Sequence, residues 1–175
     1  MQRNLLRLYN VKSIVGAYME TNVEFAKVSE PLNVLLVGNN PIDLSKTLEK
    51  IHQLRGRKII TEIAFDLRSI VERLINFTPN FILIDDNIGP TELAQAVTTL
   101  TRSRKTKNIP ITVLKNSNYK ESSPSSGILD YMLKQNFSPE SLYTAIRNSL
   151  KFRRTQLFLY KAYRGRKGQL RRMAF

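Results

Sequence analysis

Short runs of apolar residues alternate along most of this chain with longer segments in which apolar residues recur every three or four positions. The runs at residues 34–37 and 81–84 have the length and composition of buried strands, and residues 58–65, 109–114 and 128–133 are also expected to be strands. The longer segments have the spacing of helices with one apolar face. Strands and helices in this alternation predict an α/β fold with a doubly wound, five-stranded parallel sheet.

The helical segments carry recognisable start signals. Asn40 can cap the first helix, with Pro41 in its first position. Asp66 can cap the second helix, a turn at Gly89-Pro90 precedes the third, and Ser138-Pro139 opens the last. The residues expected to face the sheet are Leu44, Leu48 and Ile51; Ile70, Val71, Leu74 and Ile75; Leu93, Val97 and Leu100; and Leu142, Ile146 and Leu150.

Residues 116–126 interrupt this pattern. They lie between the fourth and fifth predicted strands, where the alternation calls for a helix, but they are rich in Ser and Asn and show no apolar period. We expect a loop or a broken helix there, so that the fourth helix of the fold is degenerate.

The strand that runs into Asp85 is the best placed to carry a functional residue. In open α/β sheets, the residues just past the carboxyl ends of the strands line the crevice where ligands bind. Asp85 follows four apolar residues and precedes Asp86, which we expect to point to the other side because side chains alternate along a strand.

Four segments resemble the receiver domain of two-component response regulators, in the order and spacing of that family. They are residues 79–85, similar to the third strand and its phosphoacceptor Asp; 109–114, similar to the fourth strand; 127–134, similar to the fifth strand; and 137–142, similar to the start of the last helix. The resemblance covers residues 32–150. It implies a flavodoxin-like receiver fold, with Asp85 as phosphoacceptor, Tyr131 as switch aromatic and Lys134 as active-site lysine.

The chain departs from the family at the positions that carry its chemistry. The acidic pair that holds Mg²⁺ in the family is replaced by Gly38 and Asn39, and the Ser or Thr after the fourth strand by Lys115. The Pro after the active-site lysine is replaced by Gln135.

These replacements predict a pseudo-receiver. Phosphoryl transfer to a carboxylate needs a divalent ion, and Mg²⁺ binds chiefly through carboxylates. Lys134, and Lys115 beside it, can neutralise Asp85 directly. We therefore expect no catalysis, no metal and no cofactor, with Tyr131 an ordinary packed aromatic. The vestigial pocket comprises Asp85, Lys134, Asn39, Lys115 and Tyr131.

The formal charge of +14 is concentrated at one end of the chain. Residues 151–175 contain nine Lys or Arg and no acid. Helices of a parallel sheet run antiparallel to its strands, so three basic segments are expected to converge opposite Asp85. These are Arg55, Arg57 and Lys58; Arg102, Arg104, Lys105 and Lys107; and Lys151, Arg153, Arg154, Lys161, Arg164, Arg166, Lys167, Arg171 and Arg172.

Aromatic residues interleave with the last of these clusters, at positions 152, 158, 160 and 163. Basic and aromatic residues together are typical of nucleic-acid binding, and a basic tail also suits an acidic protein. After Gly165 the glycine-interrupted tail is expected to order on its partner. No helix-turn-helix pattern is present in the sequence, so binding would be nonspecific in sequence or dependent on RNA shape.

The pattern divides the chain into an N-terminal arm (1–31), a receiver-like domain (32–150) and a basic C-terminal helical extension (151–175). The sequence has no Cys and one His, His52, which excludes disulfides, thiolate metal sites and His clusters. No apolar run has the length of a membrane span. We expect a cytoplasmic protein, or one of an organellar matrix if the basic first residues are a transit peptide.

The leading hypothesis is a non-catalytic scaffold that binds nucleic acid or an RNA–protein assembly through its basic end. One alternative is an interaction adaptor in a multiprotein complex, with the arm and tail on an acidic protein. Another is a single-domain phosphorelay receiver phosphorylated at Asp85. Peripheral contact with an anionic membrane surface is the weakest option for the tail.

Overall fold

The computed structural model describes residues 31–54, 58–116 and 127–173, with side chains up to residue 165. By its contacts the chain divides into two units, residues 1–31 and 32–175. The predicted arm, except Pro31, and the degenerate helix predicted at 116–126 between the last two strands, except Asn116, lie outside the described residues.

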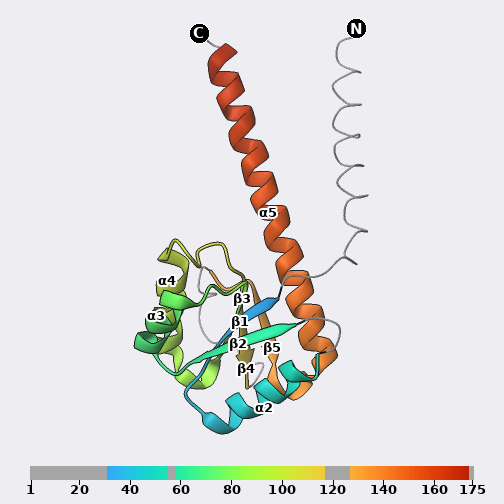
Figure 1. Cartoon of the computed structure of the whole chain (residues 1–175). Helices are drawn as coiled ribbons and strands as arrows, with labels where there is room; N and C mark the ends of the chain where they lie inside the picture. Colours follow the sequence, from blue (N-terminus) through green and yellow to red (C-terminus); the bar gives the residue numbers. More distant parts are fainter. Residues whose placement is uncertain (1–30, 55–57, 117–126, 174–175) are drawn as a thin grey trace. The chain divides into compact units, whose positions relative to one another are not determined.

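The predicted five-stranded parallel sheet is present (Figure 1). Its strands lie in the order β2-β1-β3-β4-β5, and each neighbouring pair is parallel. The strands are β1 (Leu32–Val37), β2 (Ile59–Ala64), β3 (Phe81–Asp85), β4 (Ile111–Lys115) and β5 (Asp130–Leu133). β3 is central and buried along its whole length, as its run of apolar residues requires.

Four described α-helices and two short 3₁₀ helices connect or follow the strands. They are α2 (Pro41–His52), α3 (Leu67–Asn76), η2 (Asp86–Ile88), α4 (Pro90–Arg102), η3 (Lys134–Asn136) and α5 (Pro139–Met173). The predicted caps are present: Asn40 Oδ1 accepts a hydrogen bond from the backbone N–H of Ile42 (3.0 Å), and Asp66 Oδ1 accepts one from that of Ser69 (2.7 Å).

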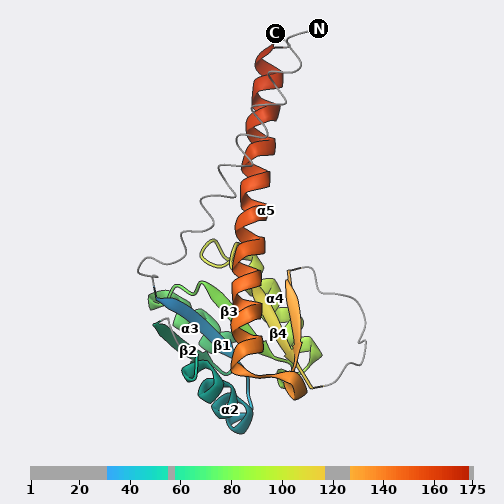
Figure 2. The same cartoon turned by 90° about the vertical axis from the view of Figure 1, so that its right-hand side faces the viewer.

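Helices cover both faces of the sheet, and each face has its own apolar core (Figures 1 and 2). One face packs against α3 and α4, and the other against α2 and α5. Because both faces are covered, chemistry open to solvent is confined to the two edges where the strands begin and end. We call the side where the strands begin the amino edge and the side where they end the carboxyl edge. These differ from the edge strands β2 and β5, which are the outermost strands of the sheet.

The prediction that Val71 and Ile75 face the sheet is wrong. Ile70 and Leu74 are buried on α3, whereas Val71 is 53% and Ile75 66% exposed. Successive residues of a helix are turned by about 100°, so a helix covered on one side buries only a stripe of them.

α5 is a single helix of 35 residues that runs past the predicted domain limit at 150. Its first turns bury Leu142 and Ile146 against the sheet, and beyond Leu150 no residue with a described side chain is buried. α5 includes Gly165 and Gly168, since each glycine costs a helix only about 1 kcal/mol relative to alanine, and the expected ordering of the tail on a partner stays a prediction. Figure 2 shows this part of α5 continuing beyond the sheet.

No helix within the described residues is long and apolar enough to span a membrane.

Candidate functional site

Three chain segments meet at the carboxyl edge of the sheet. β1 ends beside Gly38, β3 ends at Asp85, and β5 is followed directly by Lys134 in η3. Asp85 is 2% exposed, and its Oδ1 accepts a hydrogen bond from the backbone N–H of Asn87 (2.9 Å). The side chain of Asp85 thus caps η2 and has one fixed orientation.

Lys134 forms the electrostatic centre of this edge. Its Nζ lies 2.7 Å from Asp85 Oδ1, which is the contact the sequence predicts. The same Nζ lies 2.9 Å from Asp43 Oδ2, so one ammonium group bridges two carboxylates. The Lys134 side chain is 19% exposed, which means that this bridge is largely shielded from water.

Asp43 is a pocket residue that the sequence reasoning missed. It lies in the first turn of α2, the helix that leaves the carboxyl edge after β1. Strand ends alone do not reveal Asp43, because it lies in the first turn of the helix that follows, at the same edge. An acid three residues after the capping Asn40 is the signal that would have found it.

A chain of hydrogen bonds continues from Asp43 to the end of β4. Asn87 Nδ2 donates to Asp43 Oδ2, and Asn116 Nδ2 donates to Asn87 Oδ1. The backbone N–H of Asn116 donates to Asp86 Oδ2 (3.1 Å). Side-chain alternation does not apply to Asp86, because β3 ends one residue earlier and Asp86 begins η2.

The charges of this edge shift one another's pKa values. Burial opposes the charge of Lys134, but hydrogen bonds with Asp85 and Asp43 outweigh it and hold the pKa of Lys134 above 10.5. The hydrogen bond from Lys134 lowers the pKa of Asp43 below 3.8. Burial raises the pKa of Asp86 above 3.8, against the hydrogen bond from Asn116.

These shifts predict how the Asp43 pair affects stability with pH. A carboxyl whose pKa is lowered by folding stabilises the protein above 3.8, and this contribution is lost as the pH falls through its folded pKa. We expect Asp43→Asn to lower the free energy of unfolding by about 1–2 kcal/mol at pH 7, and by less near pH 3. Urea unfolding of both proteins at both pH values measures this. Glu49→Gln, on the exposed side of α2, is the control. If Asp43→Asn lowers the free energy of unfolding equally at both pH values, the Asp43 carboxylate does not stabilise the protein through its pair with Lys134.

The other predicted pocket residues are Asn39, Lys115 and Tyr131. Asn39 is exposed. Lys115 Nζ lies 5.0 Å from the centroid of the Tyr131 ring, and its charge acts on Asp86 by lowering that pKa. Tyr131 is 41% exposed, so the expectation of an ordinary packed aromatic is wrong. β5 is an edge strand, and this side chain keeps much of its surface in solvent.

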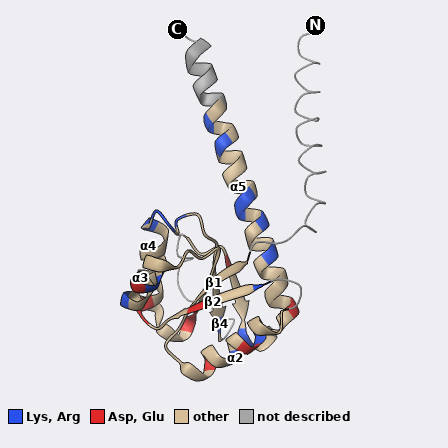
Figure 3. Ribbon diagram, in the orientation of Figure 1, with Lys and Arg blue, Asp and Glu red and all other residues tan. Residues whose placement is uncertain are grey.

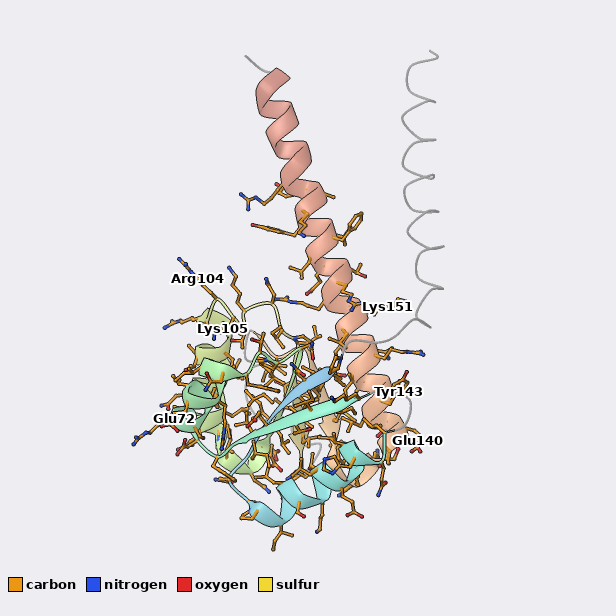
Figure 4. The ribbon with its side chains drawn as sticks, in the orientation of Figure 1. Glu72, Arg104, Lys105, Glu140, Tyr143 and Lys151 are labelled. Atoms are coloured by element: carbon orange, nitrogen blue, oxygen red, sulfur yellow. The ribbon has the colours of Figure 1, made fainter. Side chains whose placement is uncertain are left out.

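At the amino edge, α5 contacts the loop between α4 and β4. The guanidinium of Arg153 donates to the carbonyls of Lys107 (2.6 Å) and Asn108 (3.0 Å). Two of the three predicted basic segments therefore meet, as the antiparallel course of the helices requires. Figure 3 shows Lys and Arg along α5 and at the end of α4, and Figure 4 shows Arg104, Lys105 and Lys151 at this edge.

Some predicted partner-binding cations have structural contacts. Lys105 Nζ donates to the carbonyls of Leu74 (2.8 Å) and Ile75 (3.0 Å), at the negative end of α3. Lys58 is exposed at the start of β2. Arg55 and Arg57 lie outside the described residues, and the side chains of Arg166, Lys167, Arg171 and Arg172 are not described.

A groove lies between α5 and the α4–β4 loop. The residues that line it are Lys107, Asn108, Arg153, Gln156, Leu157, Leu159, Tyr160, Lys161 and Arg164. No acid is among them. The exposed apolar side chains on this part of α5 are Phe152, Leu159, Tyr160 and Tyr163.

Comparison with known proteins identifies the fold. No protein-family model matches the sequence, and no curated protein is similar to it. Solved structures of receiver domains are similar with TM-scores just below 0.6. A receiver domain of a sensor histidine kinase from Pseudomonas aeruginosa PAO1 is 17% identical (TM-score 0.59), and 70% of this chain covers 99% of it. The chemotaxis response regulator CheY4 of Vibrio cholerae is 20% identical (TM-score 0.56), and 69% of this chain covers 99% of it. A receiver domain protein from Methanospirillum hungatei JF-1 is 18% identical (TM-score 0.59), and 73% of this chain covers 99% of it.

At these identities the similarity concerns the fold. The chain has the flavodoxin-like fold of CheY-type receiver domains, as its four receiver-like segments predict.

The residues of this carboxyl edge do not fit a bound Mg²⁺. The Pseudomonas structure has a magnesium ion coordinated in its active-site cleft. Here Gly38 offers no ligand, and a Cβ at that position would lie 2.9 Å from Leu44 Cδ2 and 3.1 Å from Asp85 Cβ. Asp85 Oδ2 and Asp86 Oδ1 are buried without a hydrogen-bond partner, whereas Asp85 Oδ1 is bonded to Lys134 and to the backbone N–H of Asn87. Among the described residues, no group of three His, Cys, Asp or Glu could hold a metal.

Proposed function

We propose that this chain is a non-catalytic pseudo-receiver scaffold that binds nucleic acid or an RNA–protein assembly through its basic end. By basic end we mean the α4–β4 loop together with α5 from Lys151 onward. One observation carries this proposal. Every Lys and Arg from 151 to 164 except the half-buried Arg153 is exposed, and no acid follows Glu140. Such a surface attracts polyanions.

The non-catalytic part rests on the carboxyl edge. Receivers of this fold signal by phosphorylation of the aspartate that resembles Asp85, which needs a divalent ion to neutralise the phosphoryl oxygens. In this chain Gly38 and Asn39 occupy the positions of the acidic pair that would hold the ion. A side chain at Gly38 would be tight, because its Cβ would lie 3.1 Å from Asp85 Cβ and 2.9 Å from Leu44 Cδ2.

Incubation with acetyl phosphate and Mg²⁺ is therefore expected to leave Asp85 unmodified. Intact-mass spectrometry measures the gain of one phosphoryl group, with Asp85→Asn as the reference that cannot gain one there. A Mg²⁺-dependent acyl phosphate that is lost in Asp85→Asn would show a phosphorelay receiver instead.

The nucleic-acid part is tested by the salt dependence of binding. If about five cations contact phosphates, the logarithm of the association constant should fall with the logarithm of salt concentration at a slope of about −4.5 for duplex DNA and about −3.5 for single strands. Fluorescence anisotropy with labelled oligonucleotides measures it. A flat salt dependence, or no binding, would contradict the proposal.

The adaptor alternative gives a different result in the cell. Copurification of a defined set of proteins that survives nuclease treatment would favour an acidic protein partner. Recovery of nucleic acid or an RNA–protein assembly, lost on nuclease treatment, would favour the proposal.

A further inference from the structure

The groove at the basic end combines a fixed wall with an exposed ring. Its wall is Arg153, whose guanidinium is held by the Lys107 and Asn108 carbonyls and by Gln156 Oε1 (3.0 Å). These three contacts set the position of a cation before any ligand binds, which lowers the entropy lost on binding. Arg153 is thus a preorganised part of the groove.

Tyr160 provides a flat surface in the same groove. Tyr160 is 58% exposed, so much of its ring is open to solvent. The Arg164 guanidinium lies over the ring, 5.8 Å from its centroid and one helical turn further on, and Lys161 also lines the groove. The ring thus has one cation over it and a second in the same groove, which the amide groups of Asn108 and Gln156 also line.

We infer that this groove binds a single-stranded segment of nucleic acid, with one base stacked on Tyr160 and the flanking phosphates on Lys161 and Arg164. The inference rests on the proposed function and specifies which form of nucleic acid the basic end selects. Bases of a single strand are free to leave their stack and pack on aromatic rings. The cations beside the ring neutralise the backbone that carries the base.

A duplex and a membrane suit this groove less well. The bases of a duplex are stacked on each other, so an exposed Tyr160 ring would meet no base face there. A membrane surface is broad, whereas these residues line a concavity closed on one side by Lys107 and Asn108. Exposed Tyr163 and Phe152 lie nearby on α5 and offer further rings to a longer strand.

The test compares Tyr160→Leu with the wild-type chain on three probes: an RNA single strand of about 15 nucleotides, a blunt RNA duplex of the same sequence, and vesicles containing phosphatidylglycerol. Leucine keeps an apolar side chain on α5 but removes the ring. We expect Tyr160→Leu to weaken single-strand binding about tenfold, within the range found for loss of one stacked base, and duplex binding less than twofold. Tyr160→Phe should retain the wild-type affinity.

Tyr143→Leu is the matched control, because Tyr143 is an exposed tyrosine of α5 outside the groove. It should leave all binding unchanged. Equal losses on strand and duplex, or a loss equal to that of Tyr143→Leu, would overturn the inference but not the proposed function. If Tyr160→Leu weakens only the binding to vesicles, the groove binds a lipid surface instead of a single strand. Absence of binding to both RNAs would overturn the inference, and absence of binding to the labelled oligonucleotides of the salt series as well would overturn the proposed function itself.

Discussion

Replacement of Lys134 by methionine is expected to lower the free energy of unfolding by about 3–5 kcal/mol, the range for removal of one partner from a buried ion pair. The Asp85 carboxylate is buried, and Lys134 is its ion-pair partner. Without the ammonium group, Asp85 and Asp43 would both lose the counter-ion they share, and Asp85 would lose it in a site closed to water.

A double-mutant cycle separates this effect from lost packing. Asp85→Asn combined with Lys134→Met removes both members of the buried pair, and the asparagine Oδ1 can still accept from the backbone N–H of Asn87. The double variant should therefore be more stable than Lys134→Met alone. Urea unfolding at pH 7 gives the four free energies. If the loss of unfolding free energy in the double variant equals the sum of the losses in the two single variants, Lys134 and Asp85 are not energetically coupled.

Neutralisation of Lys161 and Arg164 together is expected to weaken single-strand binding about 25-fold at about 0.1 M salt, because each lost phosphate contact removes about 0.7 from the salt exponent. The variant is Lys161→Gln with Arg164→Gln. Both side chains are exposed and lie beyond the last buried residue of α5, so the fold should be unaffected. Anisotropy titrations across a salt series measure the affinity and the slope, which should become shallower by about 1.4.

The control removes the same charge elsewhere. Lys46→Gln with Arg68→Gln changes two exposed cations on α2 and α3. It should weaken binding only slightly, through the smaller net charge. If both double variants weaken binding equally, the protein attracts nucleic acid by its overall charge, and the groove makes no particular contact.

These two predictions concern opposite edges of one sheet. The carboxyl edge is closed by an internal ion pair, and the amino edge presents cations and rings. The variants at Lys134 should consequently leave the salt slope unchanged, and those at Lys161 should leave the urea midpoint unchanged. This independence is expected of a scaffold, whereas a phosphorelay receiver would couple Asp85 to its output surface.

Local sequence determined the fold because its signals are short-range. The apolar run of residues 81–84 is typical of a strand covered on both faces, and the caps at Asn40 and Asp66 indicate where helices begin. Parallel strands place their ends at one edge, so the closeness of Asp85 and Lys134 also followed from the sequence. The excess of positive charge at the C-terminus needed no structure at all.

The tertiary structure alone decided which side chains share a site or a face. Asp43 meets Lys134 across 91 residues of sequence, and Arg153 meets Asn108 across 45. Which stripe of α3 is buried, and thus the exposure of Val71, depends on how that helix is turned against the sheet. Tyr131 is exposed because β5 lies at the edge of the sheet. Such contacts depend on the packing of distant elements, and local patterns of apolar and polar residues carry no record of them.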